Sequence, residues 1–174
     1  MRTTIVVGLI GAGLLLAGCA SGAVSGEADP EGVAAGEPVF SPCDDIPDDA
    51  LRAVGMDPAT ESRDIYGVKQ PGWNICDWRG SGPYLTVFST THTLDDVRSN
   101  SKYTEFSSLE VSGREAISYR EVVDLDRRSC SVAVGSADGA VLISLAYLGV
   151  DQVTEDPCLV AERTIRELIG YIPA

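Results

Sequence analysis

Cysteine is the residue type in this sequence with the clearest chemistry. The chain has five cysteines in its 174 residues, at Cys19, Cys43, Cys76, Cys130 and Cys158. A thiol can be acylated, can pair in a disulfide, or can bind zinc as a thiolate. The sequence context separates the first cysteine from the other four, because only Cys19 directly follows an apolar N-terminal segment.

The N-terminal segment, residues 1–18, has the pattern of a bacterial lipoprotein signal peptide. Arg2 supplies a positive charge, an uncharged apolar stretch follows, and the letters LAGC at 16–19 resemble a lipobox. The apolar stretch is shorter than the ~20 residues that a membrane-spanning helix needs. We therefore predict cleavage before Cys19 and lipid on its thiol, which places the chain at the cell membrane, lipid-anchored on the extracytoplasmic face. An ordinary signal peptide is the alternative.

Residues 19–38 are predicted to form a flexible acidic tether. They are rich in Ala, Gly, Ser, Glu, Asp and Pro, and no aromatic residue occurs before Phe40. Such a segment buries too little apolar surface to offset the conformational entropy of ordering it. One domain is then expected over residues 39–174, a length that suits a single hydrophobic core.

The remaining four cysteines are expected to form two disulfides, since an even number outside the cytoplasm is typical of oxidised pairs. A zinc site is the alternative, but there is no C-x-x-C pair and the chain has one histidine, so no metal and no cofactor is expected. Three pairings are conceivable. Cys43 and Cys158 lie near the two ends of the domain, and Cys76 and Cys130 lie in strand-like segments. We predict the pairs Cys43–Cys158 and Cys76–Cys130.

The single histidine, His92, is the only candidate general base of the usual kind. It would need a nearby nucleophile and an orienting carboxylate, and Asp95 and Asp96 follow it closely. Those acids are also explained by a helix that begins after Thr93, where they complement the helix dipole. A small envelope hydrolase using His92 is therefore an alternative to the favoured interpretation, a non-catalytic module.

Two aromatic residues are the candidates for a binding surface. Tyr66 lies in a segment, residues 56–72, that Pro58 and Pro71 interrupt and that is predicted to be a loop, and Trp73 lies at its edge. Loops on a rigid scaffold often carry binding residues. The two aromatic side chains are expected to form the rim of a ligand or partner site.

The elements that must position these residues alternate between strands and short helices. Strands are predicted over residues 74–79, 84–90, 106–111, 114–122, 129–136 and 140–148. Helices are predicted over 47–54 and 94–99, with a last one that Asp156 caps and Pro157 opens. This order indicates an α+β domain: an antiparallel sheet of about five to six strands, with helices at both ends packed mainly on one face.

The short motifs around the four cysteines resemble a known family. FSPCD at 40–44, CDW at 76–78, REA at 114–116, SCSV at 129–132 and DPC at 156–158 follow the lipobox in this order. That set is similar to the actinobacterial lipoproteins of the family "domain of unknown function 3558". The resemblance covers about residues 38–173 and implies a disulfide-bonded domain of the cell envelope. It implies no activity and no catalytic residue.

The charge of the chain limits its partners. The formal net charge is −13, and an acidic surface repels the phosphates of nucleic acids and of anionic headgroups. We therefore expect the lipid to be the contact with the membrane, and no nucleic acid as a partner. The expected function is a cell-envelope lipoprotein that binds an envelope protein, a glycan or a lipid ligand.

Overall fold

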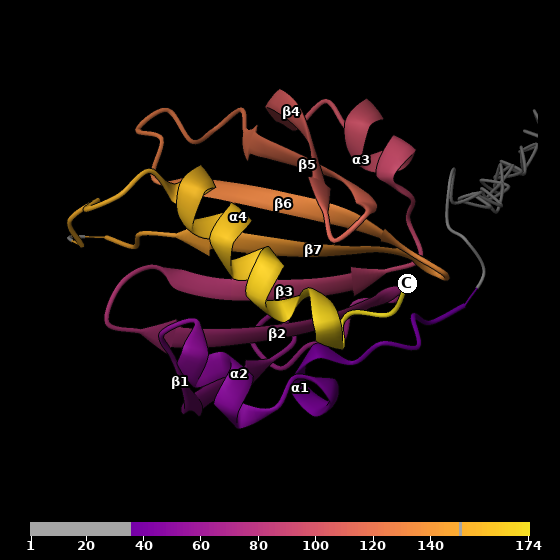
Figure 1. Cartoon of the computed structure of the whole chain (residues 1–174), viewed down its shortest axis with the longest axis horizontal. Coiled ribbons are helices and arrows are strands. Elements are labelled where there is room, and N and C mark those ends of the chain that lie inside the picture. Colours follow the sequence, from indigo (N-terminus) through magenta and orange to yellow (C-terminus); the bar gives the residue numbers. More distant parts are fainter. Residues whose placement is uncertain (1–35, 150) are drawn as a thin grey trace, which may run out of the picture. The chain divides into compact units, whose positions relative to one another are not determined.

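The computed structural model describes residues 36–149 and 151–174. Their elements are labelled in Figure 1. The predicted signal peptide, Cys19 and most of the predicted tether lie outside the described residues. Within those residues, no helix is both long enough and apolar enough to cross a membrane.

One antiparallel sheet is the largest element of the fold, and its strands pair in the order β1-β2-β3-β7-β6-β5-β4. The seven strands are β1 (Met56–Arg63), β2 (Trp73–Gly80), β3 (Tyr84–Thr90), β4 (Tyr103–Val111), β5 (Arg114–Glu121), β6 (Ser129–Ser136) and β7 (Gly139–Ala146). The β6–β7 hairpin turns at Asp138 and Gly139. A side chain on Gly139 would collide with the backbone of Thr90 and Thr91, so only glycine fits there.

Short helices cover the two faces of the sheet unequally. They are α1 (Pro42–Asp45), α2 (Asp48–Ala53), α3 (Leu94–Ser99) and α4 (Pro157–Leu168), which continues into a 3-10 turn, η1 (Ile169–Tyr171). Helix α4 crosses the middle of one face, and α1 and α2 lie beside β1 and β2 (Figure 1). Among the helices of the described residues, α3 alone packs on the other face, through Leu94 and Val97. We call this second face the open face.

The core follows from the alternation of side chains along the strands. Trp78, Val87, Val132 and Ile143 point toward α4 and belong to the main core, together with Ile165 of that helix. A smaller cluster under α3 joins residues of the open face: Val97, Ile117, Tyr119, Ala133, Ala140 and Leu142. Both faces of the central strands are therefore apolar, although helices cover only one of them fully.

Local capping signals place the helices where the sequence predicts them. Thr93 and Asp96 form a reciprocal capping box at the start of α3. Asp156 accepts a hydrogen bond from the backbone N–H of Cys158 at the start of α4, and Pro157 occupies its first turn. These predictions are confirmed, as are the bounds of β3 and β6.

The predicted fold class is wrong in its sheet. The sheet has seven strands, not five to six, and the structure is mostly this sheet with few short helices. The missed strand is β1, which the sequence analysis assigns to a loop because of Pro58. β1 is an edge strand with an irregular register between Asp57 and Ser62, and an edge tolerates a proline because one side of its backbone needs no strand partner.

The predicted disulfide pairing is also wrong. The bonds join Cys43 to Cys76 and Cys130 to Cys158, so the expected pairs Cys43–Cys158 and Cys76–Cys130 do not form. In the strand order β2-β3-β7-β6, three strand spacings of about 4.8 Å each separate Cys76 from Cys130. That is too far for a disulfide, whose Cα atoms lie within roughly 7 Å of each other. Each bond instead ties a helix to the strand beneath it.

Candidate functional site

The open face of the sheet contains a pocket of about 370 Å³. Its lining comes from most of the width of the sheet and from the loop between β1 and β2: Ile65, Gln70, Pro71, Trp73, Ile75, Phe88, Tyr103, Tyr119, Glu121, Ser131, Leu142 and Ser144. We call it the central pocket. Its volume is within the range of sites that bind small molecules.

Buried sheet side chains form the floor of the central pocket, and aromatic rings stand on both sides. Ile75 and Leu142 are buried. On the side of β2 and β3, the ring of Trp73 meets Phe88 edge to face at 6.1 Å between centroids. Aromatic pairs in this arrangement attract through their quadrupoles, which holds the rings in fixed orientations.

A second aromatic group stands on the opposite side, over β4 and β5. The rings of Tyr103 and Tyr119 lie 4.5 Å apart between centroids, and Phe106 lies 5.8 Å from Tyr119. Burial raises the pKa of Tyr119 far above its ordinary value, and burial with the nearby Glu121 carboxylate raises that of Tyr103. Both phenols are therefore neutral at physiological pH, with hydroxyl groups that can donate hydrogen bonds.

Two further hollows continue the central pocket across the open face. One, of about 290 Å³ beside α3, shares Trp73, Tyr103 and Leu142 with it. The other, of about 680 Å³ over β1, β2 and β3, shares Ile65, Ile75 and Phe88. Because neighbouring hollows have walls in common, they form one trough. We use the name trough for these three together.

Acidic side chains outnumber basic ones along the trough. Glu121 lines the central pocket, Asp96 lines the hollow beside α3, and Asp64 and Asp77 line the outer hollow, where Arg79 is the one lysine or arginine among the described residues that line the trough. Burial raises the pKa of Asp77, against hydrogen bonds from Thr86 and Tyr84 that lower it. The trough is therefore apolar in its floor and negative in its charge.

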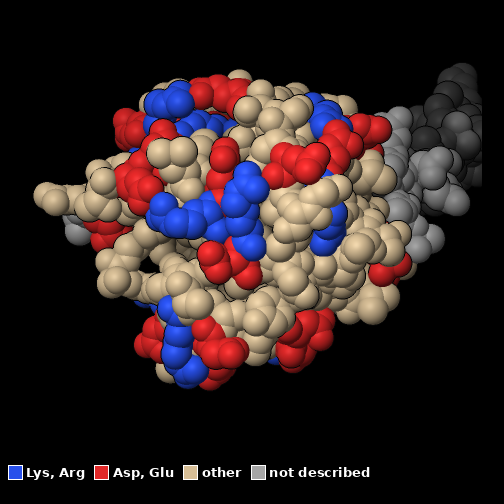
Figure 2. Space-filling model, in the orientation of Figure 1, with Lys and Arg blue, Asp and Glu red and all other residues tan. Residues whose placement is uncertain are grey.

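The helix-covered face has a different distribution of charge. Acidic and basic groups lie close together over it (Figure 2). Arg163 of α4, for example, pairs with Glu155 at 2.8 Å, and Arg52 pairs with Asp48 at 2.8 Å. Several charges on this face thus have a partner of opposite sign, whereas no described lysine or arginine pairs with Glu121, Asp64 or Asp77 in the trough.

The two residues predicted to rim a binding site both line the trough. Trp73 belongs to β2 rather than to a loop, and lies at the junction of the central pocket and the hollow beside α3. Tyr66 is 99% exposed, has a positive φ of 53°, and lines the outer hollow. Their part in binding stays a prediction.

His92 lines the hollow beside α3, which is part of the trough, and the described residues around it form no catalytic arrangement. Its Nδ1 is 4.0 Å from Asp96, and its ring lies 5.6 Å from that of Trp73. Asp96 accepts hydrogen bonds from the backbone and hydroxyl of Thr93, and the Ser99 hydroxyl donates to backbone carbonyls of α3. All four described cysteines are bonded in disulfides, so none of them offers a free thiol as a nucleophile. These contacts are those of a helix cap, and they do not favour the hydrolase alternative.

Several trough residues were missed by the sequence analysis. Tyr103, Tyr119 and Glu121 were not candidates, although Ile117, Tyr119 and Glu121 alternate with Ala116, Ser118 and Arg120 along β5. That period of two places the first three on one face. The alternation along β5 therefore indicates that these residues share a face. It does not indicate which face the helices leave open, because that depends on packing between distant segments.

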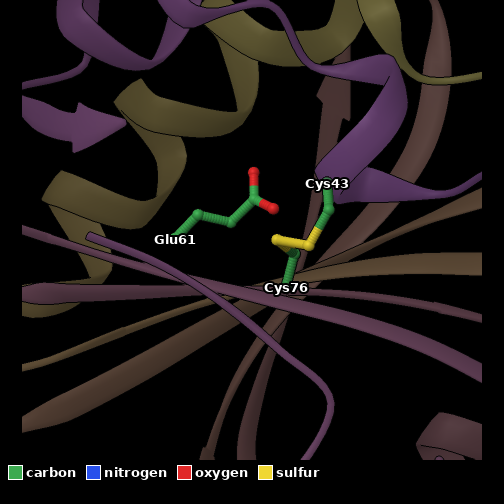
Figure 3. A group of neighbouring side chains, drawn as sticks. All are labelled: Cys43, Glu61 and Cys76. Atoms are coloured by element: carbon green, nitrogen blue, oxygen red, sulfur yellow. A yellow bond between two sulfur atoms is a disulfide. The ribbon is translucent and has the colours of Figure 1, made fainter. Parts of the chain in front are cut away.

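One group of side chains has the composition of a metal site. Glu61 lies next to the sulfur atoms of Cys43 and Cys76, with all three ligand atoms within 4.8 Å of one another (Figure 3). The two sulfurs are bonded to each other, and a disulfide offers no thiolate for a metal ion. The group is therefore a carboxylate beside a disulfide, and it does not serve as a ligand set.

Comparison with known proteins identifies the family. The model of the family described as "Protein of unknown function (DUF3558)" matches residues 14–171, which is most of the chain. The chain belongs to this family. The membership of this family that the cysteine motifs predict is thus confirmed, while the actinobacterial origin and the lipobox stay predictions. DUF3558 brings with it no assigned activity. No curated protein and no solved structure matches the chain.

Proposed function

We propose that this DUF3558 chain is a non-catalytic binding module of the cell envelope, and that a small amphipathic ligand occupies the trough. The observation that carries the proposal is the aromatic trough on the open face, over a sheet whose other face is packed and disulfide-bonded. An uncovered concave surface that is half apolar is the usual form of a ligand site.

The proposal includes the position of the domain at the membrane. Lipid on Cys19 would hold the mature chain on the outer face, with the predicted tether, residues 19–38, as the connection to the domain. Glu37, near the start of the described chain, pairs with Lys69 and accepts a hydrogen bond from the backbone of Gly72. Lys69 and Gly72 flank Gln70 and Pro71 of the trough lining. Glu37, at the end of the predicted tether, thus lies next to residues that flank the trough lining.

The test uses the mature chain, residues 19–174, with Cys19→Ser so that no acyl chain competes for the trough. Both disulfides and the core lie within residues 36–174, so this chain contains what folding requires. N-phenyl-1-naphthylamine, a neutral probe that fluoresces in apolar surroundings, should bind saturably with one site per chain. Replacing Ser144, in the central pocket, by Trp should reduce its affinity at least tenfold by filling the site.

Ser107→Trp is the matched control. Ser107 is an exposed residue of the edge strand β4, and its register partner Ser118 belongs to the helix-covered face. This variant adds the same ring outside the trough and should leave the probe affinity unchanged. Equal binding by both variants, or no saturable binding by the parent chain, would overturn the proposed site.

A further inference from the structure

We propose that the ligand of the trough carries a cationic ammonium group, which binds at Glu121 beside the ring of Tyr103. This inference deepens the proposed function and rests on it. It names the class of ligand: an amphiphile with a positively charged head and an apolar body, rather than a neutral or anionic one.

The carboxylate of Glu121 has no cationic partner among the described residues. Glu121 is an exposed residue at the rim of the central pocket, and in the described part of the chain no lysine, arginine or histidine lies within 4.0 Å of its carboxylate. Most other charged groups near it are paired: Glu105 with Arg127, and Arg120 with Asp156. A carboxylate at the wall of a pocket without a cation of its own attracts a cation from the ligand.

A pair of tyrosine rings lines the central pocket together with that carboxylate. Tyr103 is the register partner of Glu121 across β4 and β5, and its ring lies 4.5 Å from that of Tyr119. The negative faces of aromatic rings attract ammonium groups, more strongly where water is excluded. Because the two rings pack against each other, the ammonium group would lie against Tyr103 where that ring lines the pocket, next to the Glu121 carboxylate.

The rest of the central pocket suits an apolar body and has no group that would bind an anionic head. From the rings, the floor continues over Leu142 to Phe88 and Ile75, and this apolar surface suits a hydrocarbon body. Neither the central pocket nor the hollow beside α3 has a lysine or arginine in its described lining. An anionic head would meet Glu121 without a compensating cation, so carboxylate and phosphate ligands are disfavoured.

The experiment compares three probes with the same eight-carbon chain. Octyltrimethylammonium, octanol and octanoate are each titrated, below their micellar concentrations and at fixed salt, against N-phenyl-1-naphthylamine bound to the Cys19→Ser mature chain. The ammonium compound should displace the probe roughly five- to tenfold more strongly than octanol, from the cation–π and ionic attraction. Octanoate should be the weakest of the three.

Two variants that each remove one carboxylate charge test whether Glu121 causes the preference for the ammonium compound. Glu121→Gln keeps the shape of the side chain and should bring the ammonium compound to within about twofold of octanol. Glu167→Gln, the control, removes the same charge from an exposed position of α4 on the other face, and should leave the preference intact. If the Glu121→Gln variant still prefers the ammonium compound over octanol, the proposed ammonium site is overturned.

The remaining outcomes separate this inference from the proposed function. If octanol binds as well as the ammonium compound, the ammonium inference fails while ligand binding in the trough stands. If the fluorescent probe binds but octanoate displaces it best, the inference fails in the same way. If no probe binds the chain, both fail together.

Discussion

Arg120 is a charged residue inside the fold, with a side chain only 3% exposed. Its guanidinium donates to the Ser129 carbonyl and to both carboxylate oxygens of Asp156, the residue that caps α4. It thus joins β5, β6 and the start of α4. A buried cation is tolerated because these acceptors replace its water.

Replacing Arg120 by Met should lower the free energy of unfolding by about 2–3 kcal/mol, because acceptors in a partly buried site lose their donor. Urea denaturation followed by circular dichroism measures the change. Arg52→Met is the matched control, since Arg52 forms an exposed pair with Asp48 within α2. It should cost less than about 0.5 kcal/mol, and an equal loss in both variants would contradict a special role for Arg120.

Asp124 makes stability depend on pH. Burial by itself would raise the pKa of this carboxyl, but hydrogen bonds from the backbone of Arg128 and from the backbone and hydroxyl of Ser129, with the charge of Arg120, bring it below its ordinary value of 3.8. A lowered pKa means that the ionised carboxylate stabilises the fold. That stabilisation is complete above the unfolded-state pKa and is lost as the pH falls through the lower folded-state pKa.

Asp124→Asn should therefore destabilise the protein at pH 7 and make a smaller difference at pH 3. The measurement is the difference in urea midpoint between the two proteins at each pH. A difference that is the same at both pH values would show that the loss is due to geometry alone and not to the charge of Asp124.

At the scale of elements, each disulfide fastens one helix to the sheet. Cys43 of α1 binds Cys76 of β2 with a sequence separation of 33, and Cys158 of α4 binds Cys130 of β6 with a separation of 28. α1 and α2 are too short to be stable by themselves. Their position therefore depends on packing and on the covalent link to β2.

Replacing either pair of cysteines by alanine should lower the free energy of unfolding by roughly 3–4 kcal/mol, the chain-entropy value for loops of these lengths. Because the loops are similar in length, the two losses should be similar. Chemical denaturation of the two double variants checks the size of the effect. A non-reduced digest of the parent should contain the peptides Cys43–Cys76 and Cys130–Cys158, and a Cys76–Cys130 peptide would contradict the fold.

At the scale of the whole molecule, the proposal joins a lipid anchor to a binding domain. Mass spectrometry of the N-terminal peptide from native membranes should find Cys19 as the first residue, with diacylglycerol on its sulfur. Two or more acyl chains hold a protein stably at a bilayer, where one chain would be marginal. An unmodified Cys19 with residues 1–18 still attached would overturn the anchored part of the proposal.

The sequence by itself determined the local elements of this protein. Residue patterns alone correctly predict the strands β3 and β6 from their alternation. They also correctly predict the cap of α3 at Thr93 and the start of α4 at Asp156 and Pro157. These patterns involve residues that are only a few positions apart, so they can be recognised in the sequence without knowledge of the tertiary structure. The oxidation of four cysteines in two pairs was predicted in the same way.

Only the tertiary structure decided the strand order, the cysteine partners and the site. Cys76 and Cys130 share a face of the sheet, but β3 and β7 lie between their strands. Trp73 and Tyr119 come from distant parts of the chain, and they line one pocket because β7 inserts between β3 and β6 and α4 covers the other face. Such contacts depend on the pairing of segments that are far apart in the sequence. Local residue patterns do not specify that pairing.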